Sequence, residues 1–253
     1  MARNLANDLR KDLKDEKLYL EFQPQIYSDN TIFGVEALIR WEHNQFGFIQ
    51  PPLLIAIAEE SGLIDELGLW IFRSAVSKYN IFKEAGYGDI IISVNITPSQ
   101  LDNPALADEF IKITKSLNVP FNKIEIEITE QAALGGNNRI NAIKVLQEQG
   151  FRVAMDDFGM GHSSLMYLKE LNLSTIKLDG SLISEIQTNL SCREIISSIV
   201  FLCKSMNIHI IAECVENETQ KNILKELNCY CYQGFLYSKP LLLEDVLEFF
   251  NKK

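Results

Sequence analysis

Residues Ala154-Met155-Asp156-Asp157-Phe158-Gly159 join an apolar run to two adjacent carboxylates, and Met160-Gly161-His162-Ser163-Ser164-Leu165 follows directly. The run over 151–156 predicts a short buried strand, the glycines predict a turn, and the serines predict a helix start. Two carboxylates at the end of a buried strand repel each other and lose hydration, so a cation or a hydrogen-bond network must hold them. The alternative is a polar turn in which Asp157 is the N-cap of the helix.

Strands and helices alternate on both sides of this stretch. The expected strands are 89–96, 123–129, 151–156, 174–178, 208–214 and 230–236. The expected helical segments that follow them are 98–118, 137–149, 163–170, a part of 181–206, 217–227 and 242–250. A helix between successive strands indicates parallel crossover connections.

The N-terminal part departs from this alternation. A short charged helix is expected at 4–16, and strands 18–24 and 31–41 are joined by only Tyr27-Ser28-Asp29-Asn30. So short a connection cannot hold a crossover helix, so the pair should form an antiparallel hairpin. Helices at 52–60 and 64–85 follow.

Counting the hairpin gives about eight strands, the number that closes a barrel. We therefore predict an α/β fold, a TIM-like (β/α)8 barrel whose first strand is antiparallel. The chain should form a single domain over residues 1–253, with its core at about 5–250.

The composition restricts the classes of partner. A hydrophobic content of 47% excludes disordered and fibrous proteins. The formal net charge of −10 argues against nucleic acid as a partner, because no basic stripe is present to neutralise phosphates. An anionic small molecule would need metal ions to reverse the local field.

The cysteines and the apolar runs bear on the compartment. The five cysteines include no C-x-x-C pair and lie in apolar segments, which predicts buried free thiols in a reducing compartment. No signal peptide and no run of transmembrane length is present, so we expect a cytoplasmic protein without a membrane span.

Polar side chains occur where the strands should be apolar. Alternate residues of a strand share a face, and active sites of barrels lie at the carboxyl ends of the strands. One inward carboxylate there is explained by a salt bridge or a polar rim. Here several inward groups should converge on one mouth: Glu36, Asn95, Glu127, Asp156, Asp157 and Glu213.

The expected charges at this mouth do not balance. Lys177 and Arg40 are the obvious cations, against five carboxylates. Divalent metal should fill the deficit, and oxygen ligands favour Mg²⁺ or Mn²⁺ over zinc. The number of ligands predicts two ions, which a bridging aspartate would hold about 3.5–4 Å apart.

Glu36-Ala-Leu-Ile-Arg-Trp41 resembles the signature of the EAL-domain family of cyclic di-GMP phosphodiesterases. Further blocks match the family in order, so the resemblance extends over about 5–250 and is specific. These blocks are Phe22-Gln-Pro24, Ser93-Val-Asn-Ile96, Ile126-Glu-Ile-Thr-Glu130, Asp156-Asp-Phe-Gly159, Lys177-Leu-Asp179, Ala212-Glu213, Val215-Glu216, Gln233-Gly-Phe235 and Ser238-Lys-Pro240.

The resemblance implies hydrolysis of one phosphodiester of cyclic di-GMP, a bacterial second messenger, to linear pGpG. It implies one metal held by Glu36, Asn95, Glu127 and Asp156, and a second held by Asp156, Asp157 and Glu213. Catalytic roles fall to Lys177, which orients water, and to Glu213, Asp156, Asp157 and Gln233. Substrate contacts are implied for Gln23, Leu38, Arg40, Asp179, Gln233 and Pro240, and Glu130 resembles the anchor of the loop after the paired aspartates.

Four positions depart from the family pattern. Met160 replaces a threonine, Gln131 a serine, Cys214 a glycine and Thr97 a serine. None of them removes a ligand. Met160 lacks a hydroxyl in a loop that the family uses to link metals and dimer, so we expect slower turnover or an altered dimer response. Cys214 is expected to be a small buried residue.

Two other functions compete with hydrolysis. The chain would be a cyclic di-GMP receptor if it bound the ligand without cleaving it, or an interaction protein if its outer helices alone were used. The resemblance also implies a homodimer, and a separate regulatory domain or protein could supply the control.

Overall fold

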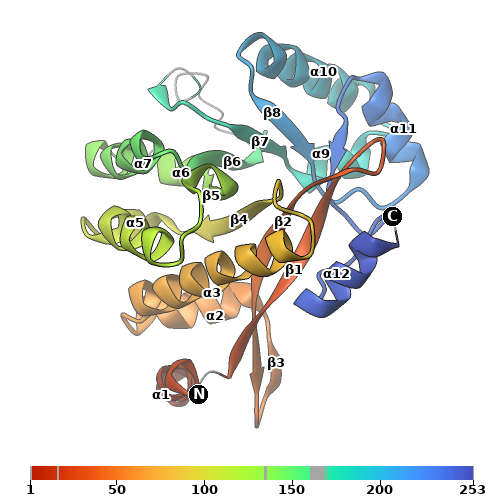
Figure 1. Ribbon diagram of the computed structural model, residues 1–253. Coiled ribbons are helices and arrows are strands. Elements are labelled where there is room, and N and C mark those ends of the chain that lie inside the picture. The colour runs from red at the N-terminus through yellow and green to blue at the C-terminus, as the bar shows by residue number, and fades with distance from the viewer. Residues whose placement is uncertain (1, 16, 134–135, 160–167, 169, 253) are drawn as a thin grey trace.

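The strands form one closed ring. The computed structural model describes residues 2–15, 17–133, 136–159, 168 and 170–252, and within them one sheet has nine strands (Figure 1). Eight of these strands close the barrel, while β3 (Gly47–Ile49) pairs outside it with β2. The barrel strands are β1 (Leu18–Tyr27), β2 (Ile32–His43), β4 (Ile91–Ile96), β5 (Ile124–Thr129), β6 (Arg152–Phe158), β7 (Thr175–Leu178), β8 (His209–Ala212) and β9 (Cys231–Tyr232).

The first strand is antiparallel to both of its neighbours. β1 pairs with β2 from Leu18 opposite Trp41 to Ile26 opposite Ile32, and with β9 only through Ile26 and Tyr27. The other neighbouring barrel strands are parallel. The predicted barrel with an antiparallel first strand is therefore confirmed.

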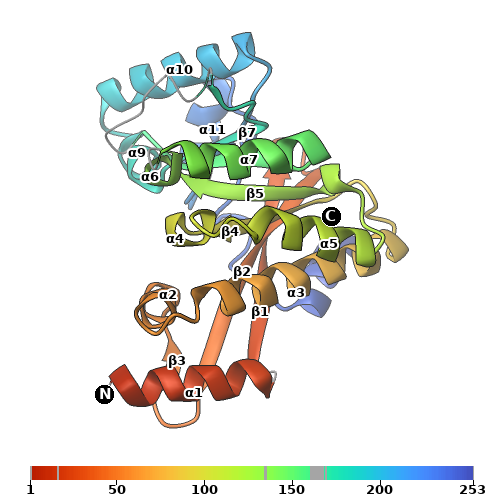
Figure 2. The same ribbon diagram turned by 90° about the vertical axis from the view of Figure 1, so that its left-hand side faces the viewer.

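Helices cover the outside of the ring (Figures 1 and 2). They are α1 (Ala2–Lys14), α2 (Pro51–Glu60), α3 (Ile64–Glu84), α4 (Pro98–Leu101), α5 (Leu106–Ser116), α6 (Glu130–Ala133), α7 (Asn137–Gln149), α9 (Gly180–Glu185), α10 (Leu190–Ser205), α11 (Glu218–Glu226) and α12 (Leu243–Asn251), with a 3₁₀ turn η1 at Phe121–Lys123. None of the described helices is long and apolar enough to cross a membrane.

Two expected helices are each divided. The segment 98–118 forms α4 and α5, because Asn103 precedes a proline, a position that disfavours helical backbone. The segment 181–206 forms α9 and α10, and the Asn189 side chain caps α10 by accepting from the amides of Ser191 and Cys192. Most of the helix expected at 163–170 lies outside the described residues.

Strand β3 was not expected. Gly47, with φ of +67°, allows a tight turn that returns the chain along β2. Helix α1 packs beside this extension, since the indole Nε1 of Trp41 donates to Asp12 Oδ2 at 3.0 Å and Leu9 is fully buried.

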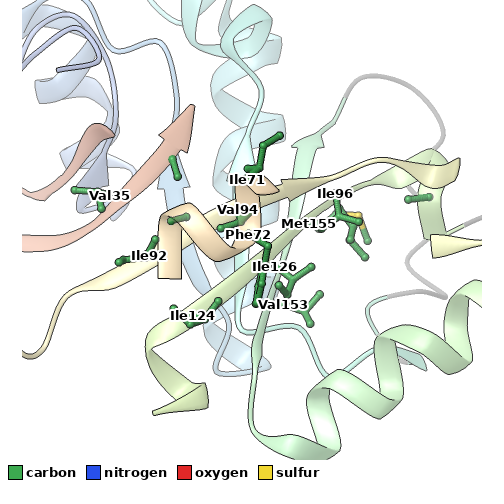
Figure 3. Close-up of a cluster of buried hydrophobic side chains, with 14 of the residues drawn as sticks. Val35, Ile71, Phe72, Ile92, Val94, Ile96, Ile124, Ile126, Val153 and Met155 are labelled. Atoms are coloured by element: carbon green, nitrogen blue, oxygen red, sulfur yellow. The ribbon is translucent and has the colours of Figure 1, made fainter. Parts of the chain in front are cut away.

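The apolar core lies between the strands and the helices. Figure 3 shows Ile92, Ile124 and Ile126 on the outer face of the barrel, near Phe72 of α3. The three isoleucines and Phe72 are fully buried, and each buried side chain of this size contributes roughly 1.5–3 kcal/mol. Because these side chains point outward, their strand neighbours face the interior, which is the parity that positions the site.

Candidate active site at the barrel mouth

Lys177 of β7 lies at the centre of an acidic cluster. Its Nζ is 2.8 Å from Glu127 Oε2 and 2.8 Å from Glu213 Oε1. It is 3.3 Å from Glu36 Oε2 and 3.3 Å from Asp156 Oδ1. The side chain of Lys177 is only 1% exposed. Four of the five expected carboxylates thus meet around one ammonium group.

Glu36 is the most completely hydrogen-bonded of these acids. Its Oε1 accepts from Asn95 Nδ2 at 2.6 Å, and its Oε2 accepts from Gln233 Nε2 at 2.5 Å. The same Gln233 nitrogen donates to Gln23 Oε1 at 3.1 Å. Burial alone would raise the pKa of Glu36, but Lys177 and the two amides outweigh it and lower that pKa.

Two buried oxygens of the cluster accept no hydrogen bond from the residues that the structure describes. They are Glu127 Oε1 and Asp156 Oδ1, the latter having only the electrostatic contact with Lys177. Burial, followed by the charge of Glu36, raises the pKa of Glu127 well above its usual range despite Lys177. Buried polar atoms are normally paired, so these oxygens indicate a site built for a further cationic partner.

The paired aspartates point to the same place as Glu213. One carboxylate oxygen from each of Asp156, Asp157 and Glu213 lies within 4.8 Å of the other two. Successive strand residues normally face opposite sides, but the register of β6 shifts between Met155 and Phe158. Asp157 also has a left-handed backbone, with φ of +54°, which aspartate tolerates better than most residues. Asp157 therefore lies within β6, and the alternative of a simple N-cap is not needed to explain it.

The protonation of the cluster reflects its excess of negative charge. Burial, with Asp156 and Glu36, raises the pKa of Glu213 to about 8 despite Lys177. Burial and Asp156 also raise the pKa of Asp157. Burial would lower the pKa of Lys177, but the surrounding carboxylates raise it well above its usual range. Lys177 is therefore an ammonium ion in this arrangement.

The donor set fits a hard divalent cation. The available atoms are carboxylate oxygens, Glu127 and Asp156 each contribute a buried oxygen without a hydrogen-bond partner, and three acids have converging oxygens. One ammonium group cannot balance the charge of the five acids, and oxygen donors are what Mg²⁺ and Mn²⁺ prefer.

Two cavities flank the cluster and share Leu38. The larger, about 470 Å³, is also lined by Arg40, Asn95 and Pro51. The smaller, about 280 Å³, is lined by Gln23, Leu38, Glu36, Glu213, Cys214, Glu216, Gln233, Gly234 and Phe235. The smaller cavity thus borders the acidic cluster directly, and the larger one reaches it through Asn95.

Arg40 corrects one expectation about the charges. Its Nε donates to Glu21 Oε2 at 2.7 Å, and its guanidinium lies 6.0 Å from the ring centre of Phe48. Arg40 therefore compensates Glu21 on the neighbouring strand and is not a second cation for the acidic cluster. The expected count of two compensating cations was wrong, because Arg40 lies opposite Tyr19 in the pairing of β1 with β2, close to Glu21.

Of the other expected site residues, Asp179 and Glu130 lie near the paired aspartates. Asp179 caps α9, accepting from the amide of Ser181 at 2.7 Å, and its charge helps to raise the pKa of Asp157. Glu130 Oε1 accepts from the amide of Gly159 at 3.3 Å, directly after the paired aspartates. Pro240 lines neither of the two cavities. Met160 lies outside the described residues.

Cys214 corrects a second expectation. Four of the five cysteines are buried, but Cys214 is exposed and lines the smaller cavity. Its φ is +52°, in the left-handed region that favours glycine. A sequence reading based on size alone could not detect this backbone conformation, so the prediction that Cys214 is buried was wrong.

Gln25 is a residue that the sequence reading missed. Its side chain is fully buried, and its Nε2 donates to Gln233 Oε1 at 3.0 Å. The available signal was strand parity, because Gln25 shares a face of β1 with Gln23.

Comparison with known proteins identifies the family. A model of the EAL domain matches residues 6–240. The chain is 35% identical over 245 residues to the bifunctional diguanylate cyclase/cyclic di-GMP phosphodiesterase MucR of Pseudomonas aeruginosa, covering 96% of this chain and 36% of MucR. It is 33% identical over 247 residues to the cyclic di-GMP phosphodiesterase NbdA of the same organism, covering 97% of this chain and 32% of NbdA. The chain thus spans about a third of the length of these relatives.

Solved structures agree with the sequence relatives. The MucR phosphodiesterase in complex with cyclic di-GMP superposes with a TM-score of 0.91 at 34% identity, covering 96% of this chain and 99% of that one. The EAL enzyme Bd1971, in its form with cAMP and cyclic di-GMP bound, gives a TM-score of 0.92 at 28% identity, covering 98% of this chain and 69% of that one. With its family model, its barrel and its acidic mouth in agreement, the chain belongs to the EAL domain family.

Proposed function

We propose that this chain is a phosphodiesterase that hydrolyses cyclic di-GMP to linear pGpG with the help of two divalent cations, Mg²⁺ or Mn²⁺. The observation that carries the proposal is the excess of buried carboxylates around Lys177, two of which keep an oxygen without a hydrogen-bond partner. The cyclic di-GMP complex of the related MucR domain supports the choice of substrate. We propose further that residues 1–253 act as one EAL-type barrel domain.

Two sets of ligands are proposed for the cations. Glu36, Asn95, Glu127 and Asp156 would hold one, and Asp156, Asp157 and Glu213 would hold the other. The amide NH₂ group of Asn95 donates a hydrogen bond to Glu36, which leaves the amide oxygen of Asn95 available as a metal ligand. Bound divalent cations lower the pKa of water and stabilise negative charge on a phosphoryl group.

Lys177 is proposed to act through its charge. It is held by Glu127 and Glu213 at 2.8 Å and remains protonated, so it can orient the attacking water and stabilise charge that develops on the phosphate. Glu213 lies beside Lys177, so one carboxylate of the proposed second metal site also fixes the position of the ammonium group.

The neighbouring residues would bind and orient the substrate. Arg40 is fixed by Glu21 and by the carbonyl of Ile39, and it faces the larger cavity, where a guanidinium can bind phosphate oxygens. A cyclic dinucleotide carries one base on each side of its phosphodiester ring. We propose that the two cavities that share Leu38 take one base each, with Gln23 and Gln233 in the smaller one.

Turnover of cyclic di-GMP tests the proposal. The purified chain is incubated with cyclic di-GMP and Mg²⁺ or Mn²⁺, and the products are separated by chromatography. Appearance of pGpG that requires metal and is lost in Glu127→Gln supports the proposal. Binding without product would instead identify a receptor, and absence of binding would leave an interaction protein.

The remaining expectations form part of the same proposal. We propose a cytoplasmic homodimer whose control comes from a separate regulatory domain or protein. Size-exclusion chromatography with light scattering tests the dimer. Comparison of Met160→Thr with the wild type tests whether this position slows turnover or alters the dimer, and identical rates and oligomeric states would dispose of that idea.

A further inference from the structure

Gln25 lies inside the barrel, two residues after Gln23 on the same face of β1. It is fully buried and pairs in register with Gly34 of β2. Its Nε2 donates to Gln233 Oε1 at 3.0 Å, across a sequence separation of 208 residues. Gln25 therefore reaches the acidic cluster only through Gln233.

The strand opposite Gln25 leaves room for its amide. A Cβ added at Gly34 would lie 2.9 Å from Gln25 Oε1 and 2.6 Å from the carbonyl oxygen of Ile91. The absence of a side chain at Gly34 is thus what allows the Gln25 carboxamide to occupy this position. Gln25 Oε1 accepts no hydrogen bond from any described residue, and the amide is held by the hydrogen bond that its nitrogen donates.

The contacts of Gln233 are compatible with one orientation of its amide. Its Nε2 donates to Glu36 Oε2 at 2.5 Å and to Gln23 Oε1 at 3.1 Å, while its Oε1 accepts from Gln25. A reversed amide would place its oxygen against the Glu36 carboxylate and its NH₂ group against the NH₂ group of Gln25. The contact with the Glu36 carboxylate would be repulsive and the hydrogen bond donated by Gln25 would be lost, so Glu36 sets this orientation and Gln25 stabilises it.

We propose that Gln25 is a positioning residue that fixes the Gln233 amide and thereby the orientation of the Glu36 carboxylate. This inference rests on the proposed function, because Glu36 is a ligand of the proposed metal site. Gln25 does not contact the acids directly, and its effect passes through the hydrogen bonds of Gln233. Residues that orient the ligands of a metal site typically change metal affinity or activity by about 10–100-fold when replaced.

A role in packing alone makes a different prediction. Methionine has a length similar to that of glutamine and would fill the same space without an unpaired amide oxygen, so packing would tolerate Gln25→Met. Gln25→Glu keeps the shape but presents only acceptor oxygens when ionised. It would favour the reversed Gln233 amide, with the Gln233 oxygen directed at Glu36.

The test compares Gln25→Glu, Gln25→Met and a control. Ser93→Ala is the control, because Ser93 is equally buried on the inner face of β4 but donates to Glu125. We expect kcat with cyclic di-GMP to fall about 10–100-fold in Gln25→Glu, and less in Gln25→Met, with KM changed by less than about threefold. Mn²⁺ binding, measured by calorimetry on the substrate-free protein, should weaken in the same order. Ser93→Ala should retain the wild-type kcat, KM and Mn²⁺ affinity.

The outcomes separate this inference from the proposed function. Wild-type kcat and Mn²⁺ affinity in both Gln25 variants would overturn the inference. It would also be overturned if kcat and Mn²⁺ affinity fell only in proportion to a fall in melting temperature. If the wild type binds Mn²⁺ but does not hydrolyse cyclic di-GMP, the proposed function fails while the order of Mn²⁺ affinities still decides the role of Gln25. If Gln25→Glu does not fold, Gln25→Met carries the comparison, and unchanged Mn²⁺ affinity in it would overturn the inference.

Discussion

The Nζ of Lys177 lies 2.8 Å from Oε2 of Glu127, and the two side chains are 1% and 0% exposed. An ion pair this deeply buried is stable only while both partners remain. The second oxygen of Glu127 has no hydrogen-bond partner within the described part of the chain. Lys177 therefore holds together acids that would otherwise repel one another, and it leaves part of their charge for another cation.

Replacement of Lys177 by methionine should unfold the metal-free protein more easily. Removing one partner of a buried pair leaves uncompensated carboxylates, which lowers the free energy of unfolding by about 3–5 kcal/mol. Turnover of cyclic di-GMP should fall by at least about 100-fold, since a charge aimed at the reacting phosphate is lost. Urea unfolding in the presence of a chelator, and then with added Mn²⁺, measures the effect.

Lys112→Met is the matched control for this variant. Lys112 Nζ also lies 2.8 Å from a carboxylate, Glu109 Oε1, but the side chains are 69% and 40% exposed. Its loss should change stability by less than about 0.5 kcal/mol. Equal stability of Lys177→Met and Lys112→Met in chelator would show that the acids do not depend on Lys177.

Asp157→Asn should separate the effect of metal from that of charge. Asparagine adopts the left-handed backbone that Asp157 has, so the turn should be preserved. Burial, followed by repulsion from Asp156 and Asp179, raises the pKa of Asp157. Removing this charge should therefore keep or raise the melting temperature in chelator, while the rise produced by Mn²⁺ should shrink.

Thermal unfolding with chelator and with Mn²⁺ measures both quantities. Asp89→Asn is the control, because that carboxylate is exposed and pairs with Lys123 away from the mouth. A Mn²⁺-induced rise in Asp157→Asn as large as in the wild type would remove Asp157 from the proposed ligand set.

Much of this site follows from strand parity. The alternation of Ile124, Glu125, Ile126 and Glu127 placed the isoleucines outside and the acids inside, and the structure buries them in that way. What parity cannot give is which charges pair across strands. The partner of Arg40 is Glu21, and this depends on the register between β1 and β2, which local sequence does not encode.

Backbone conformation was equally invisible in the sequence. The left-handed angles of Asp157 and Cys214 decide that two successive acids converge and that one thiol is exposed. Neither residue is a glycine, so nothing in the residue type announced the conformation.

Cys214→Gly should stabilise the protein. A left-handed backbone costs a residue with a Cβ about 1–2 kcal/mol, and the greater freedom of glycine in the unfolded chain offsets about 0.5–1 kcal/mol of the gain. We expect a net rise of about 0.5–1 kcal/mol over Cys214→Ala, which retains the Cβ. Chemical unfolding of both variants measures the difference, and equal stabilities would contradict the strain.

The same residue should be the reactive thiol of the folded protein. Four cysteines are buried and Cys214 is exposed, so a thiol reagent should modify one group in the native state and five after unfolding. Partial desolvation of the Cys214 sulfur, followed by the charge of Glu213, raises the pKa of this thiol, so modification should be slow at neutral pH and faster above pH 9. If Cys214→Ala has no thiol that reacts in the folded state, Cys214 is the reactive group. If one thiol still reacts in this variant, the prediction is contradicted.

His209 should make the protein less stable in acid. Its ring stacks on Phe33 with the centroids 4.3 Å apart, and Arg152 lies over the Phe33 ring. Burial, with Arg152, lowers the pKa of His209 to about 4 from 6.5. Between these values the unfolded chain binds a proton that the folded chain does not, so stability falls as the pH falls.

His209→Phe keeps the stacking and removes this titration. Relative to this variant, the wild type should lose about 1–2 kcal/mol between pH 7.5 and pH 5. Urea unfolding of both proteins at the two pH values measures it, and taking the difference cancels the titration of the carboxylates. A difference that does not change with pH would contradict the proposed burial of a neutral imidazole.

The ring of strands is completed only where β1 meets β9, through Ile26 and Tyr27 opposite Tyr232 and Cys231. A ribosome translating this chain therefore releases β1 long before its partner β9 has been synthesised. Until then, β1 and β8 present open strand edges, which can pair with the wrong neighbours. The nascent protein should depend on chaperones until its last strand emerges, and a chain truncated before β9 should aggregate rather than retain partial activity.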